Sequence, residues 1–125
     1  MKKIVFLLLV GWLLLALASC KNACRRDVVI RVKNGALEVT PPNIITGNCK
    51  RLEIRFKAKS GVRWRVDFAD PTPCDGNVKT FQSGGNATCR ISNAQNVKDN
   101  LQFTVSSEPN PPVKVFVCRG AACGP

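Results

Sequence analysis

Carboxylates are the side chains of this sequence that could perform acid–base chemistry, because its 125 residues include no histidine. A serine or cysteine nucleophile would therefore lack the base that usually activates it. Asp67, Asp70 and Asp75 lie close together around a proline-rich turn, where aspartate commonly bends and caps the chain. A weak calcium site and a glycosidase-like pair are the alternatives for these three residues. We expect turn chemistry here, and therefore no catalytic residue and no cofactor.

Seven cysteines are the second group that could carry chemistry. Three residues separate Cys20 from Cys24, and four separate Cys118 from Cys123. A zinc site prefers cysteines spaced by two residues or histidine partners, and a thioredoxin-type redox centre requires the same close spacing of two cysteines. The sequence contains neither pattern, so we predict neither a metal site nor a redox centre.

The N-terminus has the pattern of a secretory signal. Two lysines follow Met1, and the next fifteen residues, 4–18, are uncharged. A membrane-spanning helix needs about 20 apolar residues, so this run is short for one. Leu17-Ala18-Ser19-Cys20 resembles the bacterial lipobox, in which small residues precede a cysteine that is acylated and begins the mature protein. Ala16-Leu17-Ala18 is also a small-x-small cleavage site, which would instead give a soluble periplasmic protein.

The lipobox resemblance implies a place in the cell as well as a modification. Residues 1–19 would be the signal peptide, and Cys20 would carry the lipid that anchors the chain to a membrane. Lys21 follows Cys20 where inner-membrane retention signals typically have aspartate. The family rule therefore points to the outer membrane, with the protein facing the periplasm. We expect residues 20–26 to form a short tether.

Cysteine arithmetic agrees with lipidation of Cys20, because an even number of cysteines then remains. In a small exported chain such a set suggests a disulfide framework, here of three bonds. The remaining cysteines are Cys24, Cys49, Cys74, Cys89, Cys118 and Cys123. Only one pairing is predicted specifically, Cys74 with Cys89. It would close a loop of about 15 residues and contribute about 3 kcal/mol.

From Asp27 onward apolar and polar residues alternate with period two, which is the pattern of half-buried strands. Asn34-Gly35 predicts a type I′ hairpin turn, because both residues tolerate positive φ angles. Short segments rich in glycine, proline or asparagine separate the runs. The predicted strands are 28–33, 37–39, 51–57, 62–68, 78–82, 88–92, 101–106 and 113–118.

About eight short strands with frequent turns predict an all-β fold, a single small antiparallel β-sandwich over residues 27–125 that is stapled by disulfides. The order of elements resembles a cupredoxin-like or immunoglobulin-like domain, with Trp64 on the strand pair that follows the opening hairpin and residues 101–105 as the penultimate strand. A blue-copper site uses two histidines, a cysteine and a weak axial ligand such as methionine. The mature chain has no histidine and no methionine, so we exclude copper electron transfer.

Basic residues dominate the charge, with 19 lysines and arginines against 8 acidic residues. If strands 51–57 and 62–68 pair across the Lys59-Ser60-Gly61 turn, five cations share one face. These predicted binding residues are Arg51, Arg55, Lys57, Arg63 and Arg65. Arg31 and Lys33 would extend the face if the first strand joins the same sheet. The face is either a solvated surface that maintains solubility or a contact surface for an acidic protein or an anionic envelope component. Nucleic acid is not expected, because the compartment is wrong and no aromatic residues interleave these charges.

These features favour a non-catalytic interaction module of the cell envelope that is anchored by lipid. An inhibitor or immunity lipoprotein and an accessory protein of a secretion machine both belong to this class. The alternative is a structural envelope lipoprotein without a discrete ligand. Saturable binding to one partner would distinguish the two.

Overall fold

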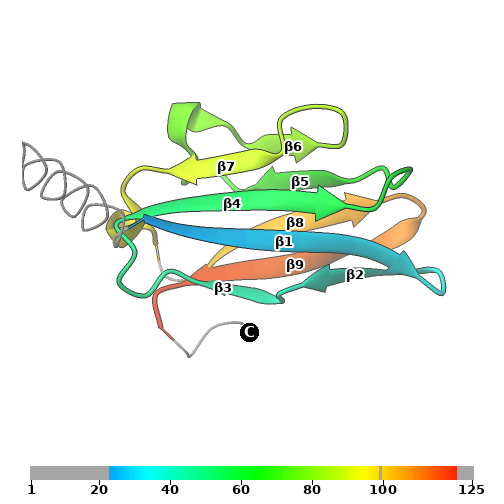
Figure 1. The fold of residues 1–125 in the computed structure, drawn as a ribbon, viewed down its shortest axis with the longest axis horizontal. Helices are drawn as coiled ribbons and strands as arrows, with labels where there is room; N and C mark the ends of the chain where they lie inside the picture. The colour runs from blue at the N-terminus through cyan, green and yellow to red at the C-terminus, as the bar shows by residue number, and fades with distance from the viewer. Residues whose placement is uncertain (1–22, 99, 121–125) are drawn as a thin grey trace, which may run out of the picture.

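The computed structural model describes residues 23–98 and 100–120, which form two β-sheets packed face to face (Figure 1). The predicted signal peptide, Cys20, Lys21 and Cys123 lie outside the described residues. The first sheet has the strand order β2-β1-β4-β7, and the second has the order β3-β9-β8-β5-β6. The strands of the first sheet are β1 (Ala23–Lys33), β2 (Ala36–Thr40), β4 (Arg51–Ala58) and β7 (Thr88–Ile91). Those of the second are β3 (Asn43–Ile45), β5 (Arg65–Phe68), β6 (Thr80–Gln82), β8 (Leu101–Ser107) and β9 (Asn110–Cys118). The all-β sandwich is as predicted.

Two strand pairs correct the expectation of a purely antiparallel sandwich. β1 runs parallel to β4, and β3 runs parallel to β9. The chain crosses at Pro41-Pro42 from β2, in the first sheet, to β3, in the second. β3 was missed in the sequence because its three residues directly follow this proline pair. β3 lies in the second sheet, beside β9. The chain then returns to the first sheet as β4, which lies beside β1 and runs in the same direction.

Residues 23–26 are not part of a tether as predicted, because β1 begins at Ala23. Cys24 forms a disulfide bond with Cys49, just before β4, and residues 23–26 pair with residues 51–54 of β4. The covalent bond and the parallel pairing instead hold this segment in the sheet.

The predicted Cys74–Cys89 disulfide is confirmed, with a Cα–Cα distance of 5.3 Å. It joins the loop between β5 and β6 to β7, and both sulfur-bearing residues are buried. Cys118 is disulfide-bonded as well. The Asn34-Gly35 turn also follows the prediction, since both residues have positive φ. The β1–β2 hairpin is thereby closed in the way that its sequence requires.

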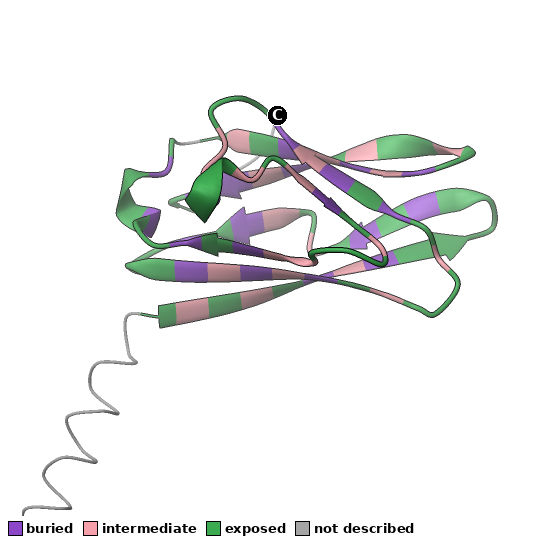
Figure 2. Cartoon of the chain, turned by 90° about the horizontal axis from the view of Figure 1, so that it is seen from above, coloured by how far each residue is buried: buried purple, intermediate pink, exposed green. Residues whose placement is uncertain are grey.

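The core lies between the two sheets, where buried positions alternate with exposed ones along the strands (Figure 2). Phe56 of β4 contacts two rings of the opposite sheet, with centroid distances of 5.4 Å to Phe81 and 5.7 Å to Phe103. Phe68 lies 4.8 Å from Phe103, and Trp64 lies 5.8 Å from Phe56. This aromatic cluster fixes the two sheets against each other and thereby determines which side chains face outward.

Candidate functional site

The outer face of the β2-β1-β4-β7 sheet carries a strong excess of positive charge. Alternation along each strand directs every second side chain away from the core onto this face, which is toward the viewer in Figure 1. Its basic residues are Arg25, Arg31, Lys33, Arg51, Arg55, Lys57 and Arg90. Its acidic residues are Asp27, Glu38 and Glu53. We call this surface the cationic face.

The outer face of the second sheet is different in character. Its charged residues are Arg65 and Asp67 on β5 and Lys114 on β9. Arg65 Nε lies 3.0 Å from a carboxylate oxygen of Asp67, so these two charges offset each other. Most other outward positions on β5, β6 and β8 are uncharged threonine, serine or glutamine. The positive excess of the sandwich therefore lies on one of its two faces.

Ion pairs neutralise the middle of the cationic face. Arg55 Nε lies 3.1 Å from Glu53 Oε1, and Lys57 Nζ lies 3.1 Å from Asp27 Oδ2. The second pair joins β4 to its parallel neighbour β1. Both pairs are partly solvent-exposed, so each contributes at most about 1 kcal/mol to stability. Their main effect is to leave little free positive charge at the centre of the sheet.

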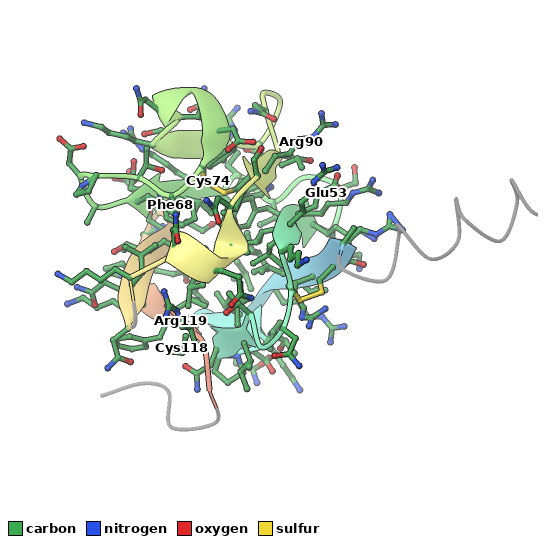
Figure 3. The ribbon with its side chains drawn as sticks, turned by 90° about the vertical axis from the view of Figure 1, so that its left-hand side faces the viewer. Glu53, Phe68, Cys74, Arg90, Cys118 and Arg119 are labelled. Atoms are coloured by element: carbon green, nitrogen blue, oxygen red, sulfur yellow. A yellow bond between two sulfur atoms is a disulfide. The ribbon has the colours of Figure 1, made fainter. Side chains whose placement is uncertain are left out.

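The remaining cations of this face lie at its two ends. The near end contains the first residue of β1, and the far end contains the Asn34-Gly35 turn. At the near end Arg25 and Arg90 lie on either side of Glu53 in the strand register, and Arg51 lies beside Ala23. Figure 3 views the sandwich from this end and shows Glu53 and Arg90 on the same side. Within the described chain, none of these three arginines forms an ion pair with a carboxylate.

The near end is held together by hydrogen bonds between its loops. The amide nitrogen of Gln95 donates to the carbonyl oxygens of Gly47, at 3.2 Å, and Cys49, at 2.7 Å. The backbone N–H of Ala94 donates to the carbonyl oxygen of Lys50 at 2.9 Å. Residues 47–50, around the Cys24–Cys49 disulfide, are thus hydrogen-bonded to the loop between β7 and β8.

A groove of about 520 Å³ lies at the far end. It forms where β1 extends beyond β4, since the last register pair of the two strands joins Ile30 with Ala58. The backbone N–H of Val62 donates to the carbonyl oxygen of Lys59 at 3.1 Å, and this turn forms the wall of the groove opposite β1. The lining residues are Val29, Arg31, Val32, Lys33, Lys59 and Val62. Three valines and three cations thus line the groove, and its lining includes no carboxylate.

The structure does not bring the five predicted binding residues onto one face. Arg51, Arg55 and Lys57 lie on the cationic face, and Arg55 and Lys57 are used in ion pairs. Arg65 lies on the opposite outer face, and Arg63 lies in the connection before β5. The five-residue patch is therefore wrong as a single surface.

The physical reason is that the Lys59-Ser60-Gly61 turn does not form a hairpin. Residues 62–64 cross from the first sheet to the second, and this path buries Trp64 against Phe56. The crossing is fixed by Ser83, which hydrogen-bonds to the backbone N–H and carbonyl of Trp64. Burial of a large ring between the sheets is worth more than continued pairing of two charged strands.

Three cations of the two ends were missed in the sequence. Arg25 was assigned to the tether, Lys59 to a turn, and Arg90 was read only as part of a strand. Inward-facing Cys89 and Ile91 could have revealed that Arg90 points outward. Arg31 and Lys33 do share the sheet of β4, as the prediction allowed.

Each of the three aspartates considered for chemistry has a structural partner. Asp67 pairs with Arg65 and accepts a hydrogen bond from Thr80 at 2.9 Å. Asp70 lies 3.1 Å from Lys79 Nζ. The side-chain hydroxyl and the backbone N–H of Ser92 both donate to Asp75, and the pKa of this carboxyl is lowered from its ordinary value of 3.8 mainly by the hydroxyl. These contacts fit turn stabilisation.

Within residues 23–98 and 100–120, no three potential metal ligands come together, and no helix is long and apolar enough to cross a membrane. No protein-family model matches the chain, and no curated protein matches it. The cationic face, by its geometry and charge, is therefore the candidate functional site.

Proposed function

We propose that this protein is a lipid-anchored, non-catalytic interaction module of a bacterial cell envelope. Acylation of Cys20 would hold it at the outer membrane on the periplasmic side, and the cationic face would bind an anionic partner. The observation that carries the proposal is the difference between the two outer faces of the sandwich. Charges that served only solubility would be expected on both faces and with mixed signs.

The position of β1 supports a close approach to the membrane. Only Lys21 and Asn22 separate Cys20 from Ala23, the first residue of β1. Three residue steps span at most about 11 Å. The Cys24–Cys49 disulfide prevents the start of β1 from unpairing to lengthen this connection. An acylated Cys20 would therefore hold the near end within reach of the lipid head groups.

The near-end cations would add to the anchor. Close to an anionic membrane each exposed lysine or arginine contributes about 1 kcal/mol of attraction, which decays within a Debye length of about 8–10 Å. Arg25, Arg51 and Arg90 lie at the end of the sandwich that the tether would hold there. Two acyl chains already suffice for stable attachment, so the cations would mainly orient the domain.

Lipidation is tested by the mass and the location of the exported chain. The wild type is expected to begin at an acylated Cys20 and to fractionate with outer membranes, and Cys20→Ser is expected to fractionate with soluble periplasmic proteins. An unmodified chain that begins at Ser19 would contradict the proposed anchor.

Partner binding is tested by quantitative capture from envelope extract with the full chain in nonionic detergent. Arg31→Glu/Arg51→Glu/Arg90→Glu reverses three of the unpaired charges of the cationic face, and Arg65→Glu/Lys114→Glu is the control on the opposite face. We expect saturable binding that falls with salt, is lost in the first variant and persists in the second. Binding that neither salt nor the first variant affects would favour a structural lipoprotein without a discrete ligand.

A further inference from the structure

The far-end groove combines positive and apolar side chains in its lining. Arg31 and Lys33 of β1 and Lys59 of the opposite turn supply the charge. Val32 is 43% exposed, one of two large hydrophobic residues in the described chain with such exposure. A ligand that fits this groove must present negative charge and apolar groups together.

No internal ion pair neutralises these cations. Glu38 of β2 lies opposite Arg31 in the strand register, yet the two do not form an ion pair among the described residues. Elsewhere on the same face, by contrast, Asp27 and Lys57 do form an ion pair. The positive charge of the groove is therefore available to an external ligand.

We infer that the far-end groove is a docking site for an extended acidic peptide segment of a protein partner. Arg31 and Lys33 are two residues apart on one strand, so their positions are separated by about 6.6 Å. Alternate side chains of an extended peptide have the same spacing. Carboxylates at alternate positions of such a peptide can face both cations, while the intervening or flanking apolar residues contact the valines.

The backbone of β1 favours the same kind of ligand. Beyond Ile30 this strand has β2 on one side but has lost its partner β4 on the other. The groove occupies that side, between β1 and the Lys59–Val62 turn. An extended peptide laid there would lie next to a strand edge of three residues, which is the situation in which peptides add to sheets.

A lipid head group fits the position less well than a protein. The β1 residues that line the groove, Val29 to Lys33, lie six to ten residue steps of about 3.3 Å beyond Ala23, so the groove lies about 20–33 Å from the near end. This part of the inference rests on the proposed function, because it assumes that Cys20 anchors the near end. The far end would then project into the periplasm, where a protein segment can reach it.

The test uses the full chain in detergent and a fluorescent peptide in which glutamate alternates with valine, measured by fluorescence anisotropy. Arg31→Glu/Lys33→Glu should weaken binding about tenfold or more, because two favourable charge contacts become repulsive. Arg65→Glu/Lys114→Glu carries the same change of charge on the opposite face and should stay within about twofold of the wild type. A peptide with glutamine in place of glutamate should not bind.

Further arms separate this inference from the proposed function. Lys59→Glu, on the other wall, should also weaken peptide binding, and it keeps the test valid if the double variant does not fold. If Arg51→Glu/Arg90→Glu weakens peptide binding as much as the groove variant, the groove is not the site, although the cationic face still binds anions. If the groove variant loses binding to anionic phospholipid vesicles but not to the peptide, the ligand is a head group and the inference is overturned. Absence of peptide binding by the wild type would also overturn it.

Discussion

Removal of the Cys24–Cys49 disulfide should destabilise the protein and release the start of β1. This bond closes a loop with a sequence separation of 25. Without it, residues 23–26 depend on their pairing with β4 alone, at the end of the strand where pairing most easily frays. The variant Cys24→Ala/Cys49→Ala therefore tests why the segment is a strand and not a tether.

The expected loss follows from the loop that the bond closes. In the chain-entropy model a loop of this length corresponds to about 3.5 kcal/mol at 25 °C. For a domain of this size such a change lowers the melting temperature by about 14–28 °C. Cys49 is buried, so removal of its sulfur adds a packing loss in the same direction.

Limited trypsin digestion distinguishes local release from general instability. Cleavage after Arg25 and Arg26 should increase strongly in Cys24→Ala/Cys49→Ala at temperatures where the rest of the domain is folded. The matched control Cys74→Ala/Cys89→Ala removes a bond of separation 15. It should lose a comparable stability, about 3 kcal/mol from the loop alone, but keep these two sites protected. A loss below about 1 kcal/mol, or equal cleavage in the two variants, would refute the reasoning.

Three other predictions concern the core, a turn and an ion pair. Phe103→Ala should lower the free energy of unfolding by about 3–5 kcal/mol in denaturant titrations, because its buried ring joins the two sheets; a loss under about 1 kcal/mol would contradict its central place. Asp75 has a lowered pKa, so its contribution to stability is present above pH 3.8 and is lost as the pH falls through the folded value. Ser92→Ala should therefore raise the pKa of Asp75 toward 3.8 in a carboxyl NMR titration, and an unchanged pKa would exclude the hydroxyl as the main cause. Asp27→Asn should change stability by less than about 1 kcal/mol, because the pair with Lys57 is exposed; a larger loss would show that the pair is structural.

Local pattern was sufficient to predict most strands, the hairpin turn and one disulfide. Alternation in residues 28–31 and 51–57 marked which side chains are buried, because one face of each strand packs against the other sheet; Val32, at the end of the first run, is exposed instead. Asn34-Gly35 defined a turn through its own backbone preference. These features depend on neighbours in sequence.

Pairing partners could not be predicted in the same way. The sequence around Lys59-Ser60-Gly61 is compatible with a hairpin, but burial of Trp64 takes the chain across to the second sheet. The parallel pairing of β1 with β4 depends on the route of β3 and on the Cys24–Cys49 bond. These long-range choices decided which cations share a surface, so the excess of positive charge was evident in the sequence and its location was not.

Lysine footprinting in intact cells tests the partner-binding surface most directly. Lys33 and Lys59 line the far-end groove, and Lys114 lies on the opposite outer face; all three are exposed in the isolated chain. We expect an amine-reactive label to modify Lys33 and Lys59 much less in cells than in the purified protein, and to modify Lys114 equally in both. Equal labelling of all three in cells, or protection of Lys114 alone, would contradict partner binding at this surface.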